Sequence, residues 1–157
     1  MRTTTLCYIH ADGRTLLLHR TKKRADPNAG KWIGIGGGVE PGETVEQCLL
    51  REVREETGLT LTEYAARGLV HFRSDSAPDE DMYLFTATGF TGEMTVCDEG
   101  ELQWIPDEDV PDMPTWEGDR VFLGMLEEGE KWFEVTLRYE GEKLAEVIRN
   151  GVSQRMG

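Results

Sequence analysis

Short apolar runs separated by glycine, proline and acidic residues recur along the whole chain, which is typical of strands joined by turns. Two segments differ because their apolar residues recur at helical spacing: one follows residue 44, and the other spans residues 116–129. This order predicts an α/β fold in which a mixed β-sheet is sandwiched between α-helices. The predicted strands are residues 3–10, 15–20, 31–37, 64–74, 81–90 and 101–106, followed by a hairpin within residues 131–149.

The helix predicted after residue 44 carries a cluster of acidic side chains. Glu52, Glu55 and Glu56 project from one face, and Val45 and Leu49 begin the same stripe. If this stripe stays against the body of the protein, the carboxylates repel one another and lose hydration, which is costly for each ion. The stripe has no local positive charge to compensate it, so a divalent cation is expected, and hard oxygen ligands favour Mg²⁺ or Mn²⁺ over zinc. The alternative is a solvated acidic helix end.

The spacing around these acids is specific. Gly37 is followed after five residues by Glu43, and after seven more by the stretch REVREETGL, residues 51–59. With this spacing the chain resembles the Nudix hydrolase family at every defined position of that family's box. The resemblance implies a loop, helix and loop that hold divalent metal against a substrate diphosphate. It also implies catalytic and metal-binding roles for Glu52, Glu55 and Glu56.

The glycines of this motif have roles of their own. Gly36, Gly37 and Gly38 permit a tight turn and a close approach to a ligand, and Gly58 suits the end of the helix. The resemblance implies that Gly36 contributes to the metal site and that Gly37 and Gly38 contribute to substrate binding. The box residues to which it gives a structural role are Gly37, Glu43, Arg51 and Gly58.

The resemblance extends from about residue 4 to residue 147, and it is nearest to the 8-oxo-dGTP diphosphatases of the MutT type, in particular the bacterial MutX proteins. It implies the Nudix fold for a single domain, residues 1–157. The chain departs from the pattern at Gly38, where many relatives carry lysine, and at Ile33, where the mammalian enzyme uses asparagine against the base. The stretches that carry the resemblance are residues 29–44, 97–106, 114–119 and 138–144.

Further functional residues follow from the same resemblance. Glu99 takes the position of an additional acid near the metals, and Trp116 that of a tryptophan that stacks on the base. Asp119 matches an acid that contacts the base, whereas Gly118 replaces the neighbouring acid of the mammalian enzyme. Lys23 matches a contact to the phosphate or nucleoside. Each has a plainer alternative: an exposed loop acid, core packing, a helix cap and a solvated lysine, respectively.

Composition narrows the class of protein. The chain of 157 residues is long enough for one domain with a core, and its formal net charge of −13 argues against binding long nucleic acid. It has no long apolar run that predicts a membrane span. Its three cysteines are scattered without metal spacing and indicate reduced thiols. We expect a cytoplasmic monomer or weak homodimer whose partner is a small nucleotide.

These expectations together predict a metal-dependent hydrolase that converts a nucleoside triphosphate, foremost 8-oxo-dGTP, to the monophosphate and pyrophosphate. One box glutamate, Glu55 or Glu56, would orient or deprotonate the attacking water. The alternatives are another Nudix substrate, such as ADP-ribose, a dinucleoside polyphosphate or an RNA cap, and a ligand sensor that has lost catalysis.

Overall fold

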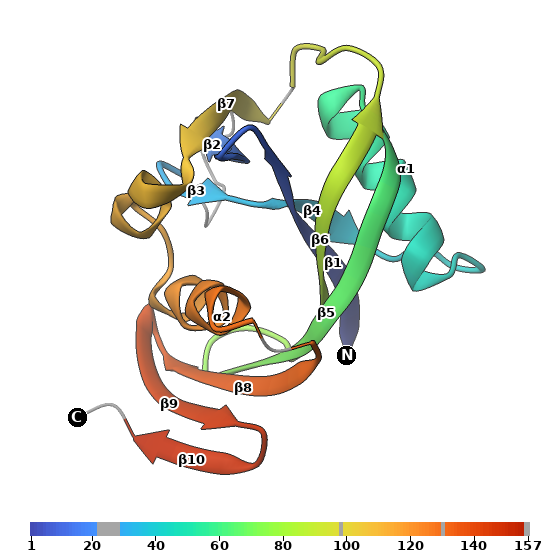
Figure 1. The fold of residues 1–157 in the computed structure, drawn as a ribbon. Coiled ribbons are helices and arrows are strands. Elements are labelled where there is room, and N and C mark those ends of the chain that lie inside the picture. Colours follow the sequence, from blue (N-terminus) through green and yellow to red (C-terminus); the bar gives the residue numbers. More distant parts are fainter. Residues whose placement is uncertain (22–28, 98, 130, 156–157) are drawn as a thin grey trace.

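The computed structural model describes residues 1–21, 29–97, 99–129 and 131–155. Figure 1 shows a curved sheet with two helices, α1 (Val45–Thr57) and α2 (Glu117–Glu127), and a short 3₁₀ helix, η1 (Asp107–Asp112), lies before α2. Neither helix in the described part of the chain is long and apolar enough to cross a membrane. The strands are β1 (Arg2–Ala11), β2 (Arg14–Arg20), β3 (Trp32–Ile33), β4 (Ile35–Gly38), β5 (Thr60–Ser74), β6 (Glu80–Thr91), β7 (Gly100–Pro106), β8 (Phe133–Glu140), β9 (Lys143–Arg149) and β10 (Val152–Arg155).

Strand β1 lies at the centre of the sheet. It runs parallel to β6 along one edge, and along the other edge it pairs antiparallel first with β4 and then with β2. From β6 the sheet continues through β5, β8 and β9 to β10, and from β2 it continues to β3 and β7. Strands β5 and β8 are also parallel, so the described sheet is mixed, as the sequence predicts.

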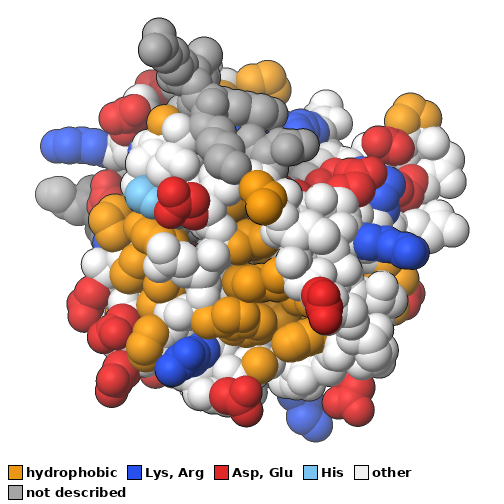
Figure 2. Space-filling view, turned by 90° about the horizontal axis from the view of Figure 1, so that it is seen from above, with side chains coloured by type: hydrophobic (Ala, Val, Ile, Leu, Met, Phe, Trp, Pro, Cys, Tyr) orange, Lys and Arg blue, Asp and Glu red, His pale blue; other side chains and the backbone are white. Residues whose placement is uncertain are grey.

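Alternate residues of β1 face two separate cores. Tyr8 packs in the core that contains Phe122 of α2, whereas Ile9 packs in the core that contains Leu49 of α1, and all four side chains are buried. The two helices therefore cover opposite faces of the sheet, and the apolar run of β1 at residues 6–9 is buried because both faces of the strand are covered. On the surface of the molecule seen from above, hydrophobic side chains gather in the middle and charged side chains lie around them (Figure 2).

The predicted strands are confirmed with two differences. The strand expected over residues 31–37 is divided at Gly34, because β3 pairs with β2 whereas β4 pairs with β1. Strand β10 is not predicted by the sequence, since it is short and follows a turn. That turn is made by Asn150 and Gly151, both with positive φ, and it folds β10 back onto β9.

The first turn of α2 is fixed against β8 through a glycine. The backbone N–H of Gly118 donates a hydrogen bond to the hydroxyl of Tyr139 at 2.8 Å. A Cβ atom at Gly118 would lie 2.5 Å from that hydroxyl oxygen and 2.7 Å from a methyl of Leu137. The space beside Gly118 is therefore filled by Tyr139 and Leu137, which leaves no room for a side chain at this position.

We expect Gly118→Ala to destabilise the protein by about 1–3 kcal/mol, because the added methyl overpacks this contact. Chemical denaturation measures the change. Gly124→Ala, in the same helix, is the matched control, since a Cβ there has no atom within 4 Å. The control should be neutral or stabilising by up to about 1 kcal/mol, through the better helix propensity of alanine. Equal effects of the two substitutions would contradict the packing described for Gly118.

Candidate active site

Helix α1 is anchored at both ends, and its register decides which acids face the protein. Thr44 is the N-cap: its hydroxyl accepts a hydrogen bond from the backbone of Gln47, whose side chain accepts one from the backbone of Thr44 in return. Gly58 ends the helix in the left-handed conformation, with φ of 80°. Between these caps, the helix face that carries the predicted stripe is directed toward the body of the protein.

Arg51 fastens the helix to the preceding loop and to β4. Its guanidinium binds both carboxylate oxygens of Glu43, at 2.7 and 2.9 Å, and donates to the carbonyl of Gly38 at 3.1 Å. This pairing holds the pKa of Glu43 down at about 2, through the hydrogen bond from Arg51 in the first place. The structural role implied for Glu43 and Arg51 agrees with this geometry.

The same guanidinium also reaches two of the box acids. It donates to Glu52 at 2.8 Å and to Glu55 at 3.2 Å. The carboxylate of Glu52 rests against the glycine-rich strand, since a Cβ atom at Gly37 would lie 2.5–2.7 Å from its atoms. Gly37 is thus needed to make room for Glu52. Glu55 differs from Glu52 because its side chain is 60% exposed, against 16% for Glu52.

Glu56 is the buried member of the set, with 8% of its surface exposed. Its carboxylate accepts a hydrogen bond from the backbone N–H of Gly36 at 3.1 Å. The pKa of Glu56 is raised to about 9, by burial in the first place and then by a hydrogen bond with the carboxyl of Glu99. The alternative of a solvated acidic helix end is therefore wrong for Glu56, because the apolar stripe carries this acid inside the protein.

The expectation that the acidic stripe lacks local positive charge is wrong. Arg51 lies beside Glu52, and Arg20 of β2 binds Glu99 at 3.0 Å. The contact of Arg20 with Glu99 joins segments far apart in the sequence and has no local pattern, whereas Arg51 and Glu55 are an i, i+4 pair that helical spacing alone would place together. Among the described residues, no three acidic, histidine or cysteine side chains form a closed metal-binding cluster.

The donors present nevertheless suit a hard divalent cation. Glu52, Glu56 and Glu99 interact electrostatically, and the pKa of Glu52 is raised by burial and by the neighbouring acids. Carboxylates that lie close enough for Glu99 to raise the pKa of both Glu52 and Glu56 are stabilised by a cation that takes oxygen ligands. The residues that would hold Mg²⁺ are Glu52, Glu56 and Glu99, with Glu55 on the exposed rim and Gly36 beside Glu56.

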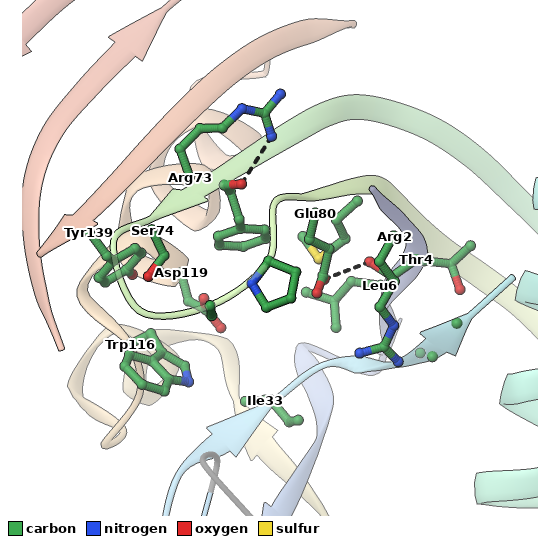
Figure 3. Close-up of a pocket in the computed structure, with 18 of the residues that line it drawn as sticks. Arg2, Thr4, Leu6, Ile33, Arg73, Ser74, Glu80, Trp116, Asp119 and Tyr139 are labelled. Atoms are coloured by element: carbon green, nitrogen blue, oxygen red, sulfur yellow. Dashed lines mark hydrogen bonds between the residues drawn. The ribbon is translucent and has the colours of Figure 1, made fainter. Parts of the chain in front are cut away.

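Two of these acids, Glu52 and Glu99, line a cavity of about 880 Å³. Its lining includes Glu52 and Glu99 at one end and Trp116 and Asp119 at the other. Figure 3 shows Trp116, Asp119 and Tyr139 together beside α2, facing Ile33 across the cavity. The structure thus brings Glu52 and Glu99 to the same cavity as Trp116 and Asp119, with Gly36, Gly37 and Gly38 in its lining, whereas Glu55 and Glu56 are not among the lining residues.

The aromatic end of the cavity is more elaborate than the sequence predicts. The ring of Trp116 meets Tyr139 edge-on, with centroids 5.8 Å apart, and the ammonium of Lys31 lies 4.2 Å from the centre of the indole. Sequence reasoning does not single out Lys31 or Tyr139, although residues 138–144 carry part of the resemblance. Lys23 lies outside the described residues.

Asp119 is buried in the first turn of α2, with 7% of its surface exposed. Burial raises its pKa to about 7, while Thr115, which donates to its carboxylate at 3.4 Å, lowers it. The helix has no side-chain cap, so the alternative of a capping role does not apply to Asp119. A buried carboxylate on a cavity wall is available to a ligand.

The histidines and cysteines play other parts. His19 stacks on Trp32 with ring centroids 4.3 Å apart, and His71 lies between the carboxylates of Asp81 and Glu134. The free cysteines are all buried: they are Cys7, Cys48 and Cys97. None of these side chains lines the cavity.

Carboxylates, a glycine strand and a capped helix at the end of a cavity define a hydrolase of the Nudix class. The chain belongs to the Nudix hydrolase family, because the family model described as the NUDIX domain matches residues 1–126. The prediction of a Nudix hydrolase enzyme is thereby confirmed.

Individual relatives agree with this assignment. The chain is 31% identical over 147 residues to the uncharacterized Nudix hydrolase YvcI of Bacillus subtilis, covering 90% of this chain and 89% of that protein. It is 35% identical over 123 residues to the oxidized purine nucleoside triphosphate hydrolase of Danio rerio, covering 78% and 77% respectively. The crystal structure of a mutator MutT protein from Bacillus halodurans superposes with a TM-score of 0.85, at 25% identity, over 96% of this chain and 98% of that chain. The predicted Nudix fold is confirmed.

Glu56 makes the stability of the protein depend on pH. Its pKa rises from 4.5 to about 9 on folding, so between these values the unfolded chain releases a proton that the folded chain keeps. Stability without divalent metal should therefore fall as the pH rises through this window. We expect Glu56→Gln to raise the melting temperature in EDTA by several degrees at about pH 8.5 and far less at about pH 5. Glu55→Gln, at an exposed neighbour, should show no such difference, and a pH-independent effect of Glu56→Gln would contradict the assignment.

Proposed function

We propose that this Nudix hydrolase cleaves purine nucleoside triphosphates to the monophosphate and pyrophosphate with Mg²⁺, and that 8-oxo-dGTP is its preferred substrate. The observation that supports this most directly is the cavity, which has carboxylates at one end and a tryptophan with a buried carboxylate at the other. A nucleotide presents phosphates and a base at its two ends in the same way. The cavity volume lies within the range of small-molecule sites.

The acidic end supplies the chemistry. Bound Mg²⁺ would neutralise phosphate charge and lower the pKa of water. Glu52 and Glu99 would hold the metal, since both line the cavity. Glu56 is our candidate for the group that orients and deprotonates the attacking water, because it is buried and fixed by the N–H of Gly36. Glu55 is the weaker candidate, since it is exposed and held by Arg51.

The aromatic end would read the base. The indole of Trp116 offers a face for stacking, and the carboxylate of Asp119 accepts hydrogen bonds when it is ionised. An oxidised guanine carries N–H donors along its Watson–Crick edge and at N7, so it can offer more donors to Asp119 than guanine can. Among the relatives, the zebrafish protein is named an oxidized purine nucleoside triphosphate hydrolase.

A substrate panel with Mg²⁺, resolved by chromatography, tests the proposal. It contains 8-oxo-dGTP, the unmodified triphosphates, ADP-ribose, a dinucleoside polyphosphate and capped RNA. We expect the highest kcat/KM for 8-oxo-dGTP, with pyrophosphate as the second product and no turnover in EDTA. Glu56→Gln should lower kcat by orders of magnitude while the protein stays folded. Equal kcat/KM for 8-oxo-dGTP and dGTP would overturn the proposed preference for the oxidised nucleotide. A larger kcat/KM for ADP-ribose would identify ADP-ribose as the substrate instead.

Substitutions at the aromatic end separate base reading from catalysis. Asp119→Ala should lower kcat/KM more for 8-oxo-dGTP than for dGTP, by about 10-fold or more, because a hydrogen bond to a charged partner contributes about 1.5–3 kcal/mol. Trp116→Ala should lower kcat/KM for both nucleotides, since stacking does not distinguish them. Equal losses for the two nucleotides in Asp119→Ala would remove Asp119 from base discrimination.

A further inference from the structure

Arg2, at the start of β1, lies against β4, which carries Gly36, Gly37 and Gly38 and is called the glycine strand below. The guanidinium of Arg2 lines the cavity together with Gly36, Gly37 and Gly38. Its Nη2, Nε and Cζ atoms lie 3.2, 3.5 and 3.8 Å from the position that a Cβ atom of Gly38 would occupy. Figure 3 shows this guanidinium beside the strand, at the opposite end of the cavity from Trp116. Arg2 is therefore at the end where the carboxylates lie.

The charge of Arg2 has no counter-charge among the residues that the structure describes. Within residues 1–21, 29–97, 99–129 and 131–155, no side chain makes a hydrogen bond or ion pair with its guanidinium. The other arginines of the cavity wall are engaged, Arg20 with Glu99 and Arg73 with Asp81. An uncompensated guanidinium at a cavity wall, in a chain of net charge −13, marks a place for an anionic group.

The acid paired with Arg2 in the strand register is engaged with another residue. Glu80 is the neighbour of Arg2 across the β1–β6 pairing, but its carboxylate accepts a hydrogen bond from the hydroxyl of Thr4 at 2.8 Å. The fork of donors on Arg2 therefore remains open toward the cavity. Guanidinium groups bind phosphate through two parallel hydrogen bonds, so a phosphoryl group matches this geometry.

We propose that Arg2 is a substrate-binding residue that donates hydrogen bonds to the polyphosphate of the nucleotide. This inference rests on the proposed function, because it assigns the phosphates to this end of the cavity. It also gives a physical reason for Gly38: a side chain at residue 38 and the guanidinium of Arg2 compete for the same volume. The chain places its cation on β1 instead of on the glycine strand.

Binding of inorganic tripolyphosphate in the presence of Mg²⁺, measured by calorimetry, tests the site without turnover of a nucleotide. Arg2→Ala should weaken binding about 10-fold, the effect of one charged hydrogen-bond donor, and Arg2→Lys should recover part of the loss. The loss should shrink at high salt, since it is electrostatic. Arg14→Ala removes the same charge from an exposed position of β2 outside the cavity and should leave binding unchanged.

A double substitution tests the shared volume. Gly38→Lys alone should disturb the wall, because its Cβ atom would lie 3.2 Å from Arg2, whereas Arg2→Ala with Gly38→Lys should regain tripolyphosphate affinity. A double variant that binds no better than Arg2→Ala would contradict the competition for space. Melting temperatures equal to that of the unsubstituted protein establish that each variant is folded.

Kinetics with the preferred nucleoside triphosphate separate this inference from the proposed function. Arg2→Ala should raise KM about 10-fold with kcat within about 2-fold, because Arg2 binds phosphate without taking part in the bond change. If tripolyphosphate binding depends on Arg2 but the protein hydrolyses no nucleoside triphosphate, the role of Arg2 in phosphate binding stands and the proposed substrate is overturned. If Arg2→Ala matches Arg14→Ala in calorimetry, the assignment of Arg2 is overturned and the proposed function stands.

Discussion

The guanidinium of Arg51 joins the three parts of the carboxylate end of the cavity. It binds Glu43 in the loop before α1, Glu52 within α1, and the carbonyl of Gly38 in β4. Without it, the helix would lose its bond to the carbonyl of Gly38, and the carboxylate of Glu52 would lose the counter-charge beside it. Because a guanidinium has several donors in a fixed plane, one side chain can set the loop, the helix and the strand in one arrangement.

This arrangement also explains how the protein tolerates so many acids in one place. Arg51 and Arg20 each hold one carboxylate at the cavity wall, whereas Glu56 is held by a backbone N–H and keeps a raised pKa. The two kinds of acid have different chemistry. The pKa of Glu52 is raised by burial but lowered by its hydrogen bond from Arg51, whereas the pKa of Glu56 is raised to about 9, so Glu56 has the basicity that a group accepting a proton from water would need.

Local patterns in the sequence account for most of the fold and for the acidic end of the site. Apolar runs and helical spacing predict the strands, α1 and α2, and the fixed spacing from Gly37 to Glu56 places the acids on one face of a helix that is confirmed. Contacts between distant segments have no such pattern. The approach of Arg20 to Glu99 and the packing of Tyr139 on Gly118 depend on strand order, and β10 depends on a turn made by Asn150 with positive φ.

The two ends of the cavity are built on different helices, so their relative position depends on the strand between them. Successive residues of β1 face the core under α2 and the core under α1 in turn, and Leu6 of this strand also lines the cavity. A change in the register of β1 would exchange the two faces and move both helices relative to the ligand. The long parallel pairing of β1 with β6, from Arg2 to Ile9, fixes that register. The base reading that we propose beside α2 and the phosphate chemistry that we propose beside α1 would therefore be held at a constant separation by one central strand, whose first residue is Arg2.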